Sequence, residues 1–113
     1  MKYSDMVLAG FKKVKGNVLM YAYFKGDPKK PDSACIRSMA CLGFLGTADL
    51  PRLGNKFYDI EEDTMTKIFK VIGNHSGKTN EICMPSAGIM VEQLNNHELR
   101  PLDFVGMLQS EGL

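Results

Sequence analysis

The apolar residues of this chain are densest in Ser33–Gly46, where mainly Arg37 and the serines interrupt a run of alanine, cysteine, isoleucine, methionine, leucine and phenylalanine. A helix that is apolar on nearly every side is buried in a folded protein. Ser33 follows a loop that contains two prolines and is suited to cap the helix, and Gly46 is suited to the left-handed conformation after its end. We therefore expect Ser33–Leu45 to form a central helix around which the rest of the chain packs.

A helix is also expected near the N-terminus, after Ser4 and before Gly16. Val7 and Phe11 have helical spacing, and several lysines follow at the end that favours cations. Gly10 weakens the helix slightly, so we expect another element to pack closely against it.

The third expected helix begins with a capping-box spacing, with Asp59 three residues before Glu62. Its apolar stripe runs from Ile60 to Ile72 and stops at Gly73. The preceding segment, Thr47–Tyr58, has the composition of a loop.

Two helices are expected near the C-terminus, the first from Ser86 to Asn96 and the second beginning with Pro101 and ending before Gly112. They are close enough in sequence to form an αα-hairpin. The second helix has no lysine or arginine beyond Arg100 at its start. We therefore interpret the pair as structural, because a helix that reads DNA presents several such side chains. The residues expected to turn inward are Phe104, Val105 and Leu108.

One segment, Val18–Lys25, has the composition of a strand, rich in β-branched and aromatic residues. The candidate partners are Lys56–Tyr58, Glu81–Met84 or the same strand of a second copy. The patterns together predict a mainly α fold: a small helical bundle of four or five helices with one short strand or hairpin, α+β being the alternative. We see no linker that divides the 113 residues, so a single domain over 1–113 is expected.

Composition narrows the class of protein. Apolar residues make up 44% of the chain and charged residues 24%, as in ordinary globular domains. No apolar run is long enough to span a bilayer, and the N-terminus is too polar for a signal peptide. Three cysteines without paired spacing argue against a disulfide framework. We expect a cytoplasmic protein with reduced thiols and no membrane partner.

Charge is unevenly distributed along the chain. Residues 1–37 hold eight Lys/Arg against three Asp, whereas the remainder holds six Lys/Arg against ten Asp/Glu. This asymmetry indicates either a basic surface for an anionic partner or two solvated faces of opposite sign. The lysines that would contact nucleic acid are Lys12, Lys13, Lys15, Lys29 and Lys30.

The segment Gly73–Asn80, GNHSGKTN, resembles a phosphate-binding loop but is one residue short of the G-x-x-x-x-G-K-[ST] spacing. A helix precedes it where that motif requires a strand. We therefore interpret it as a polar turn, with Lys78 as a weak anion-binding candidate.

No catalytic, metal or cofactor site is expected. Cys35 and Cys41 are six residues apart and so face different sides of a helix, which makes them poor joint ligands. Their apolar surroundings also disfavour a reactive thiolate. His75 and His97 lie in polar segments, and the acids near Asp59 are explained by a helix start.

Three segments resemble a loose group of small, uncharacterised phage and prophage proteins: Cys35–Gly43, Ile89–Asn96 and Leu102–Leu108. Those proteins pair a helix rich in alanine, cysteine and glycine with a C-terminal Leu-Asn-Asp turn and an acidic-aliphatic helix. The resemblance implies an accessory protein that acts on a host or phage macromolecule, and it implies no reaction.

We therefore expect a non-catalytic protein-binding module. Eight methionines in 113 residues suit an adaptable contact surface, unless they fill an irregular core. An exposed edge of Val18–Lys25 would also allow a homodimer. The alternative is a nucleic-acid-binding regulator that uses the basic N-terminal third.

Overall fold

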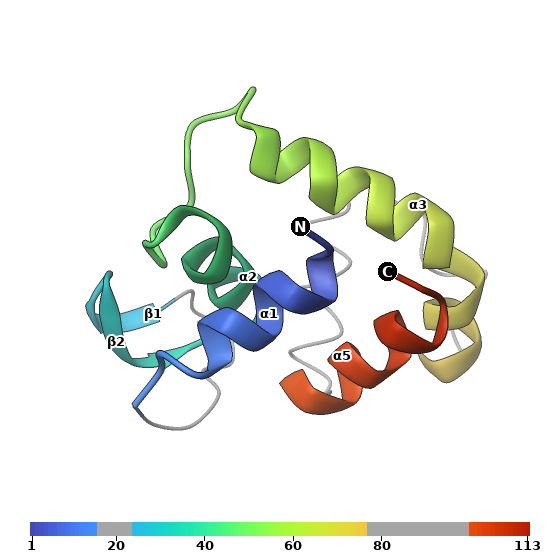
Figure 1. The fold of residues 1–113 in the computed structure, drawn as a ribbon, viewed down its shortest axis with the longest axis horizontal. Coiled ribbons are helices and arrows are strands. Elements are labelled where there is room, and N and C mark those ends of the chain that lie inside the picture. Colours follow the sequence, from blue (N-terminus) through green and yellow to red (C-terminus); the bar gives the residue numbers. More distant parts are fainter. Residues whose placement is uncertain (16–23, 77–99) are drawn as a thin grey trace.

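The computed structural model describes residues 1–15, 24–76 and 100–113. These residues form four helices and a two-stranded antiparallel hairpin: α1 (Tyr3–Phe11), β1 (Phe24–Asp27), β2 (Lys30–Ala34), α2 (Ile36–Leu45), α3 (Lys56–Ser76) and α5 (Pro101–Ser110) (Figure 1). The expectation of a mostly helical domain with a short hairpin is confirmed at this level. None of the described helices has a stretch that is long and apolar enough to cross a bilayer.

Helix α1 is the element that the other described helices share. It packs against α2 and α5 and touches α3, and it lies in the middle of the molecule in Figure 1. The burial expected for α2 is confirmed, since Met39, Ala40, Cys41 and Leu42 are all inaccessible to solvent. The central place expected for α2 belongs to α1 within the described residues.

Helices α1 and α2 cross with their backbones in contact. A Cβ atom on Gly10 would lie 1.7 Å from the carbonyl oxygen of Met39, and one on Gly43 would lie 2.0 Å from the carbonyl oxygen of Met6. Only glycine fits at these two positions without moving the helices apart. The close packing expected at Gly10 is confirmed, and its partner is α2.

The start of α2 differs from the expectation. Ser33 is not the cap, because it lies in β2, paired with Lys25 of β1. Cys35 caps the helix instead, and its sulfur accepts a hydrogen bond of 3.4 Å from the backbone N–H of Ser38. The expected end is confirmed, since Gly46 has φ of 78°.

The hairpin corrects the expected strand pairing. Only the last two residues of Val18–Lys25 are among the described residues, and they belong to β1. Their partner strand is the adjacent Lys30–Ala34, where the prolines favoured a loop. Pro31 is tolerated there since the pairing is irregular next to it and the strand is short. Of the candidate partners, Lys56–Tyr58 is helical, and Glu81–Met84 lies outside the described residues.

Helix α3 begins earlier than the capping-box pattern indicates. The side-chain oxygen of Asn55 accepts a hydrogen bond of 2.9 Å from the backbone N–H of Phe57, so Asn55 acts as the cap. Asp59 therefore lies inside the helix rather than before it. The helix also continues past Gly73 to Ser76, so the first residues of the expected polar loop are helical.

Helix α5 agrees with the sequence pattern. Pro101 occupies its first turn, and Gly112 follows it with φ of 73°. The residues expected to turn inward, Phe104, Val105 and Leu108, are buried. The helix expected over Ser86–Asn96, and with it the αα-hairpin, lies outside the described residues.

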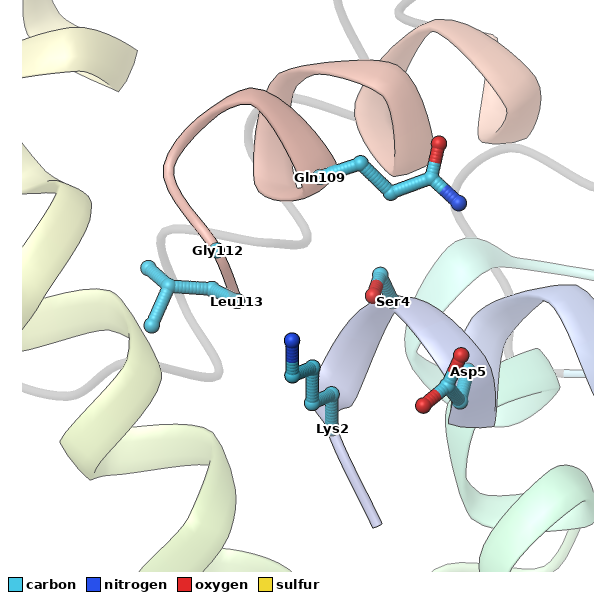
Figure 2. A pocket seen from close by; sticks show the side chains of 6 residues that line it. All are labelled: Lys2, Ser4, Asp5, Gln109, Gly112 and Leu113. Carbon is cyan, nitrogen blue, oxygen red and sulfur yellow. The ribbon is translucent and has the colours of Figure 1, made fainter.

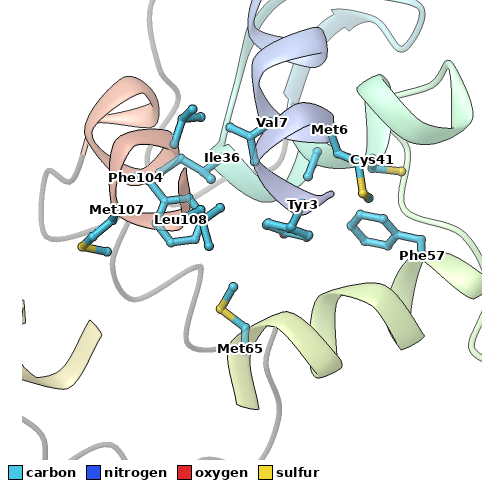
Figure 3. Packing of buried hydrophobic residues seen from close by; sticks show 12 residues of the cluster. Tyr3, Met6, Val7, Ile36, Cys41, Phe57, Met65, Phe104, Met107 and Leu108 are labelled. Carbon is cyan, nitrogen blue, oxygen red and sulfur yellow. The ribbon is translucent and has the colours of Figure 1, made fainter. Parts of the chain in front are cut away.

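The core gathers around Tyr3 at the start of α1 (Figure 3). Its ring lies 6.4 Å from that of Phe57 on α3 and 6.3 Å, edge-on, from that of Phe104 on α5. Ile36 of α2 and Met65 of α3 belong to the same cluster. One aromatic side chain thus joins three helices, which explains why a short N-terminal helix can occupy the centre of the fold.

Candidate functional site

Three of the lysines singled out from the sequence follow directly after α1. Lys12, Lys13 and Lys15 are exposed, and the backbone N–H of Lys15 donates a hydrogen bond of 3.1 Å to the carbonyl oxygen of Pro31 in β2. This bond attaches the end of α1 to the hairpin.

The other two lysines, Lys29 and Lys30, are exposed at the turn of the hairpin. The turn is closed by a hydrogen bond of 2.8 Å from the backbone N–H of Lys29 to a side-chain oxygen of Asp27. On its other side, the carbonyl oxygen of Pro28 accepts a hydrogen bond of 2.7 Å from the backbone N–H of Ala48. The hairpin is therefore held by the segments that follow α1 and α2.

These contacts bring lysines from two separate stretches to one end of the molecule, which we call the hairpin end (Figure 1). Its exposed cationic side chains are Lys12, Lys13, Lys15, Lys25, Lys29 and Lys30. Two exposed acids, Asp27 and Asp32, lie on the hairpin itself, and exposed Asp49 follows Ala48. The surface is thus basic with interspersed carboxylates. Lys78, the weak anion-binding candidate, lies outside the described residues.

A cluster of polar side chains is buried in the core, and the sequence analysis did not predict it. Glu61 of α3 is only 1% exposed. Its carboxylate accepts a hydrogen bond of 2.7 Å from the hydroxyl of Tyr3, and it lies 3.0 Å from the guanidinium of Arg37 on α2. Three helices therefore meet at one carboxylate.

Neighbouring groups fix the protonation and position of this cluster. Burial raises the pKa of Tyr3 well above its usual value, and the carboxylate of Glu61 raises it further, so the phenol remains a hydrogen-bond donor. The guanidinium of Arg37 lies 5.4 Å from the ring centre of Tyr58. The hydroxyl of Tyr58 in turn donates a hydrogen bond of 2.6 Å to the carbonyl oxygen of Pro51.

The sequence contains a signal for this cluster. Phe57, Glu61 and Met65 recur at intervals of four residues, which places them on one face of a helix, and all three are buried. A helix beginning at Asp59 would have Glu61 in a solvated first turn. The helix begins at Lys56 instead, so Glu61 lies in its second turn, on the buried face that it shares with Phe57 and Met65.

The described thiols lack the surroundings of a nucleophile. Cys35 and Cys41 are buried, as expected. Burial, with the carboxylate of Asp49 adding to it, raises the pKa of Cys41 from 9.0 to about 11. Its sulfur lies 3.5 Å from the carbonyl oxygen of Asp49. A thiol in this setting is protonated at neutral pH and is a poor nucleophile.

No group of three histidine, cysteine or acidic side chains with the geometry of a metal site occurs among the described residues. His97 and Cys83 lie outside them.

Comparison of the chain with protein-family models, with curated proteins and with solved structures found no match.

Proposed function

We propose that this protein is a small, non-catalytic binding module that docks its hairpin end onto an acidic surface of a partner protein. The observation that carries the proposal is the meeting of lysines from two separate stretches, attached to each other through the hydrogen bond from Lys15 to Pro31. A concentration of exposed cations attracts and orients an anionic partner. The resemblance to phage accessory proteins supports a host or phage protein as that partner, in the cytoplasm of the host.

Mixed charge favours a protein partner over a nucleic acid. Asp27, Asp32 and Asp49 are exposed among or beside the lysines, and each would lie close to a phosphate backbone that covered this end. Carboxylates repel phosphates, whereas a protein surface can offer a cation opposite each of them. The described residues of the hairpin end also include no arginine, the side chain best suited to bidentate phosphate contacts.

Nucleic acid is the second candidate, favoured by the number of exposed lysines at the hairpin end. Such binding would be independent of sequence, since lysine contacts phosphates as a point charge.

A second copy of this chain is a further candidate partner, since Asp59, Glu62 and Asp63 are exposed on α3 and would provide an acidic surface for the hairpin end.

The methionines give less support to a contact surface than the sequence suggested. Of the five described, Met6, Met39, Met65 and Met107 are buried, and only Met1 is exposed.

The non-catalytic character is supported by the two described thiols, which are buried. Glu61 is engaged by Tyr3 and Arg37 inside the core, where a substrate would have to displace those partners.

For the fold, we propose a helical bundle in which Ser86–Asn96 is one further helix.

The test compares two fourfold charge-reversal variants. In the first, Lys12, Lys13, Lys29 and Lys30 are changed to glutamate. In the control, the four exposed cations Arg52, Lys56, Lys67 and Arg100, which lie outside the hairpin end, are changed in the same way. Each protein is immobilised and used to capture partners from a nuclease-treated bacterial lysate. DNA and RNA shift assays over a salt series accompany the capture.

A partner protein that the wild type and the control retain after nuclease treatment, and that the hairpin-end variant loses, supports the proposal. Steeply salt-dependent shifts of DNA or RNA, lost in the hairpin-end variant alone, would replace it with the nucleic-acid function. Equal capture by both variants would exclude the hairpin end as the binding surface. Sedimentation of the purified protein identifies self-association.

A further inference from the structure

One side of α5 presents uncharged residues to solvent. Leu102, Gly106 and Gln109 follow one another at intervals of four and three residues, so they lie on one face of the helix, and all three are exposed. Leu102, the largest apolar side chain among them, is 52% exposed. Helix α5 lies at the periphery of the described fold, with α1 on one side of it (Figure 1). An uncharged stripe of this kind, bordered by charged residues, has the composition of the centre of a protein interface.

Gly106, in the middle of the stripe, has a property that marks a helix contact elsewhere in the protein. Glycine weakens a helix relative to alanine, so a helical glycine is expected where another backbone approaches closely. Gly10 and Gly43 meet this expectation, because α1 and α2 touch through them. Around Gly106, no atom of another described element lies within 4 Å of the Cβ that it lacks. The stripe is therefore suited to a helix crossing, and none of the described elements occupies it.

A hollow of about 220 Å³ adjoins the stripe, between the end of α5 and the start of α1. Gln109 belongs to both, and its side chain extends toward the start of α1 (Figure 2). Lys2 and Asp5 line the hollow from the α1 side, and both are exposed. The hollow thus offers one cation and one anion beside the stripe.

The start of α5 carries the complementary charges. Arg100 and Asp103 are exposed on either side of Leu102. Arg100 complements Asp5, and Asp103 complements Lys2. Within one chain the start of α5 and the hollow lie at opposite ends of this helix, so their complementarity favours a second copy of the chain as the partner.

We propose that two copies of this chain associate through α5, antiparallel and crossing at Gly106, with Leu102 of each copy in the hollow of the other. Leu102 lies four residues before Gly106, and Gln109 lies three residues after it. A two-fold axis beside Gly106 therefore brings Leu102 of one copy next to Gln109 of the other. Each contact between opposite charges then occurs twice.

This association is independent of the proposed function. None of the hairpin-end lysines belongs to the stripe or lines the hollow, so the dimer leaves them to another partner. One short helix provides a small interface, so the dimer is weak. We expect a dimer at about 500 µM protein and a monomer at about 10 µM, the range used for circular dichroism.

The test is sedimentation velocity of the purified protein between about 10 and 500 µM. Gly106→Gln, which places a side chain at the crossing, and Leu102→Ser should each weaken the association of the wild type by about tenfold or more. The matched controls are Thr66→Gln and Leu53→Ser, at exposed positions outside α5 and the hollow, and they should associate as the wild type does. Circular dichroism of each variant checks that the fold is kept.

Charge reversal tests the role of the hollow. Arg100→Glu and Asp5→Lys should each weaken association by about tenfold, because each brings like charges together. The double variant joins opposite charges again and should recover association. A mixture of the two single variants should also associate more strongly than either alone, since both charge contacts of the mixed dimer join opposite signs.

A wild type that stays monomeric over the whole range would overturn the proposal, as would association that Gly106→Gln and Leu102→Ser leave unchanged. Failure of the double variant to recover association would overturn the docking of Leu102 in the hollow. If the variant with Lys12, Lys13, Lys29 and Lys30 changed to glutamate lost association, the hairpin end would replace α5 as the surface of self-association.

Discussion

At the scale of single residues, the most consequential side chain is Glu61. A buried carboxylate is costly unless cations and donors surround it. Here Arg37 supplies the charge and Tyr3 supplies a hydroxyl, each from a different helix. The cluster therefore favours the arrangement in which the N-terminal ends of α1 and α2 both meet α3.

Removing this carboxylate should destabilise the fold. We expect Glu61→Ala to lower the free energy of unfolding by about 3 kcal/mol, because the guanidinium of Arg37 loses a buried partner and the hydroxyl of Tyr3 loses its acceptor. Urea denaturation measures the change. Glu62→Ala, at the exposed neighbouring position, is the control and should cost less than about 0.5 kcal/mol. Equal effects of the two substitutions would contradict the structure.

The buried thiol and phenol predict instability at alkaline pH. In the folded protein the pKa of Cys41 is raised from 9.0 to about 11 and that of Tyr3 is raised above 10.0. Between the unfolded and folded values the folded protein holds protons that the unfolded chain has released, so the free energy of unfolding falls as pH rises. We expect stability to decline from about pH 9 in urea titrations at successive pH values.

Cys41→Ala tests which group is responsible. In this variant the decline between pH 9.0 and about 11 should become shallower, whatever the substitution costs at neutral pH. An unchanged slope in that range would show that Cys41 does not titrate as its burial requires.

At the scale of elements, the crossing of α1 and α2 depends on two small residues. Gly10 and Gly43 each face a backbone carbonyl group of the opposite helix. The crossing therefore allows direct contact between backbones, which brings Met6 and Met39 into the core on either side.

Substitution of these glycines should separate the helices. We expect Gly10→Ala and Gly43→Ala each to cost about 2 kcal/mol or more, since an added methyl group would overlap backbone atoms that cannot rotate away. Thermal unfolding followed by circular dichroism measures the loss. Gly106→Ala on α5 is the matched control, because among the described residues no atom of another element lies within 4 Å of the added Cβ. It should be neutral or stabilise the protein by up to about 1 kcal/mol, as alanine favours helix.

At the scale of the whole molecule, the structure separates a lysine-rich end from an aromatic core. The hairpin end is held through backbone hydrogen bonds to Pro28 and Pro31, and its lysine side chains are exposed. The core around Tyr3 lies at the opposite end of α1.

This separation predicts that charge can be changed without loss of the fold. The variant with Lys12, Lys13, Lys29 and Lys30 changed to glutamate should keep the helical circular dichroism spectrum and unfold within a few degrees of the wild type, because exposed side chains contribute little to stability. A large fall in melting temperature would mean that these lysines have a structural role, and the binding test would then need single substitutions.

The sequence by itself determined the features that depend on local pattern. The helical content, the left-handed end of α2 at Gly46, the proline in the first turn of α5 and the burial of Cys35 and Cys41 all follow from spacing and residue type. Gly10 even indicated a close contact, although not its partner. The lysines at the hairpin end could be selected from the sequence because charge is visible in it directly.

Only the tertiary structure decided which segments meet. Ser33 and Asp59 are both residue types that cap helices. Ser33 instead pairs with Lys25 in the hairpin, and Asp59 lies inside α3 because Asn55 caps that helix. Glu61 therefore lies in the second turn of α3, on the buried face that it shares with Phe57 and Met65. Its partners lie 24 and 58 residues away in the sequence, and no local pattern specifies an ion pair or hydrogen bond over such separations. Local pattern fixes the face of each element, whereas the partner of that face depends on how all the faces are covered together.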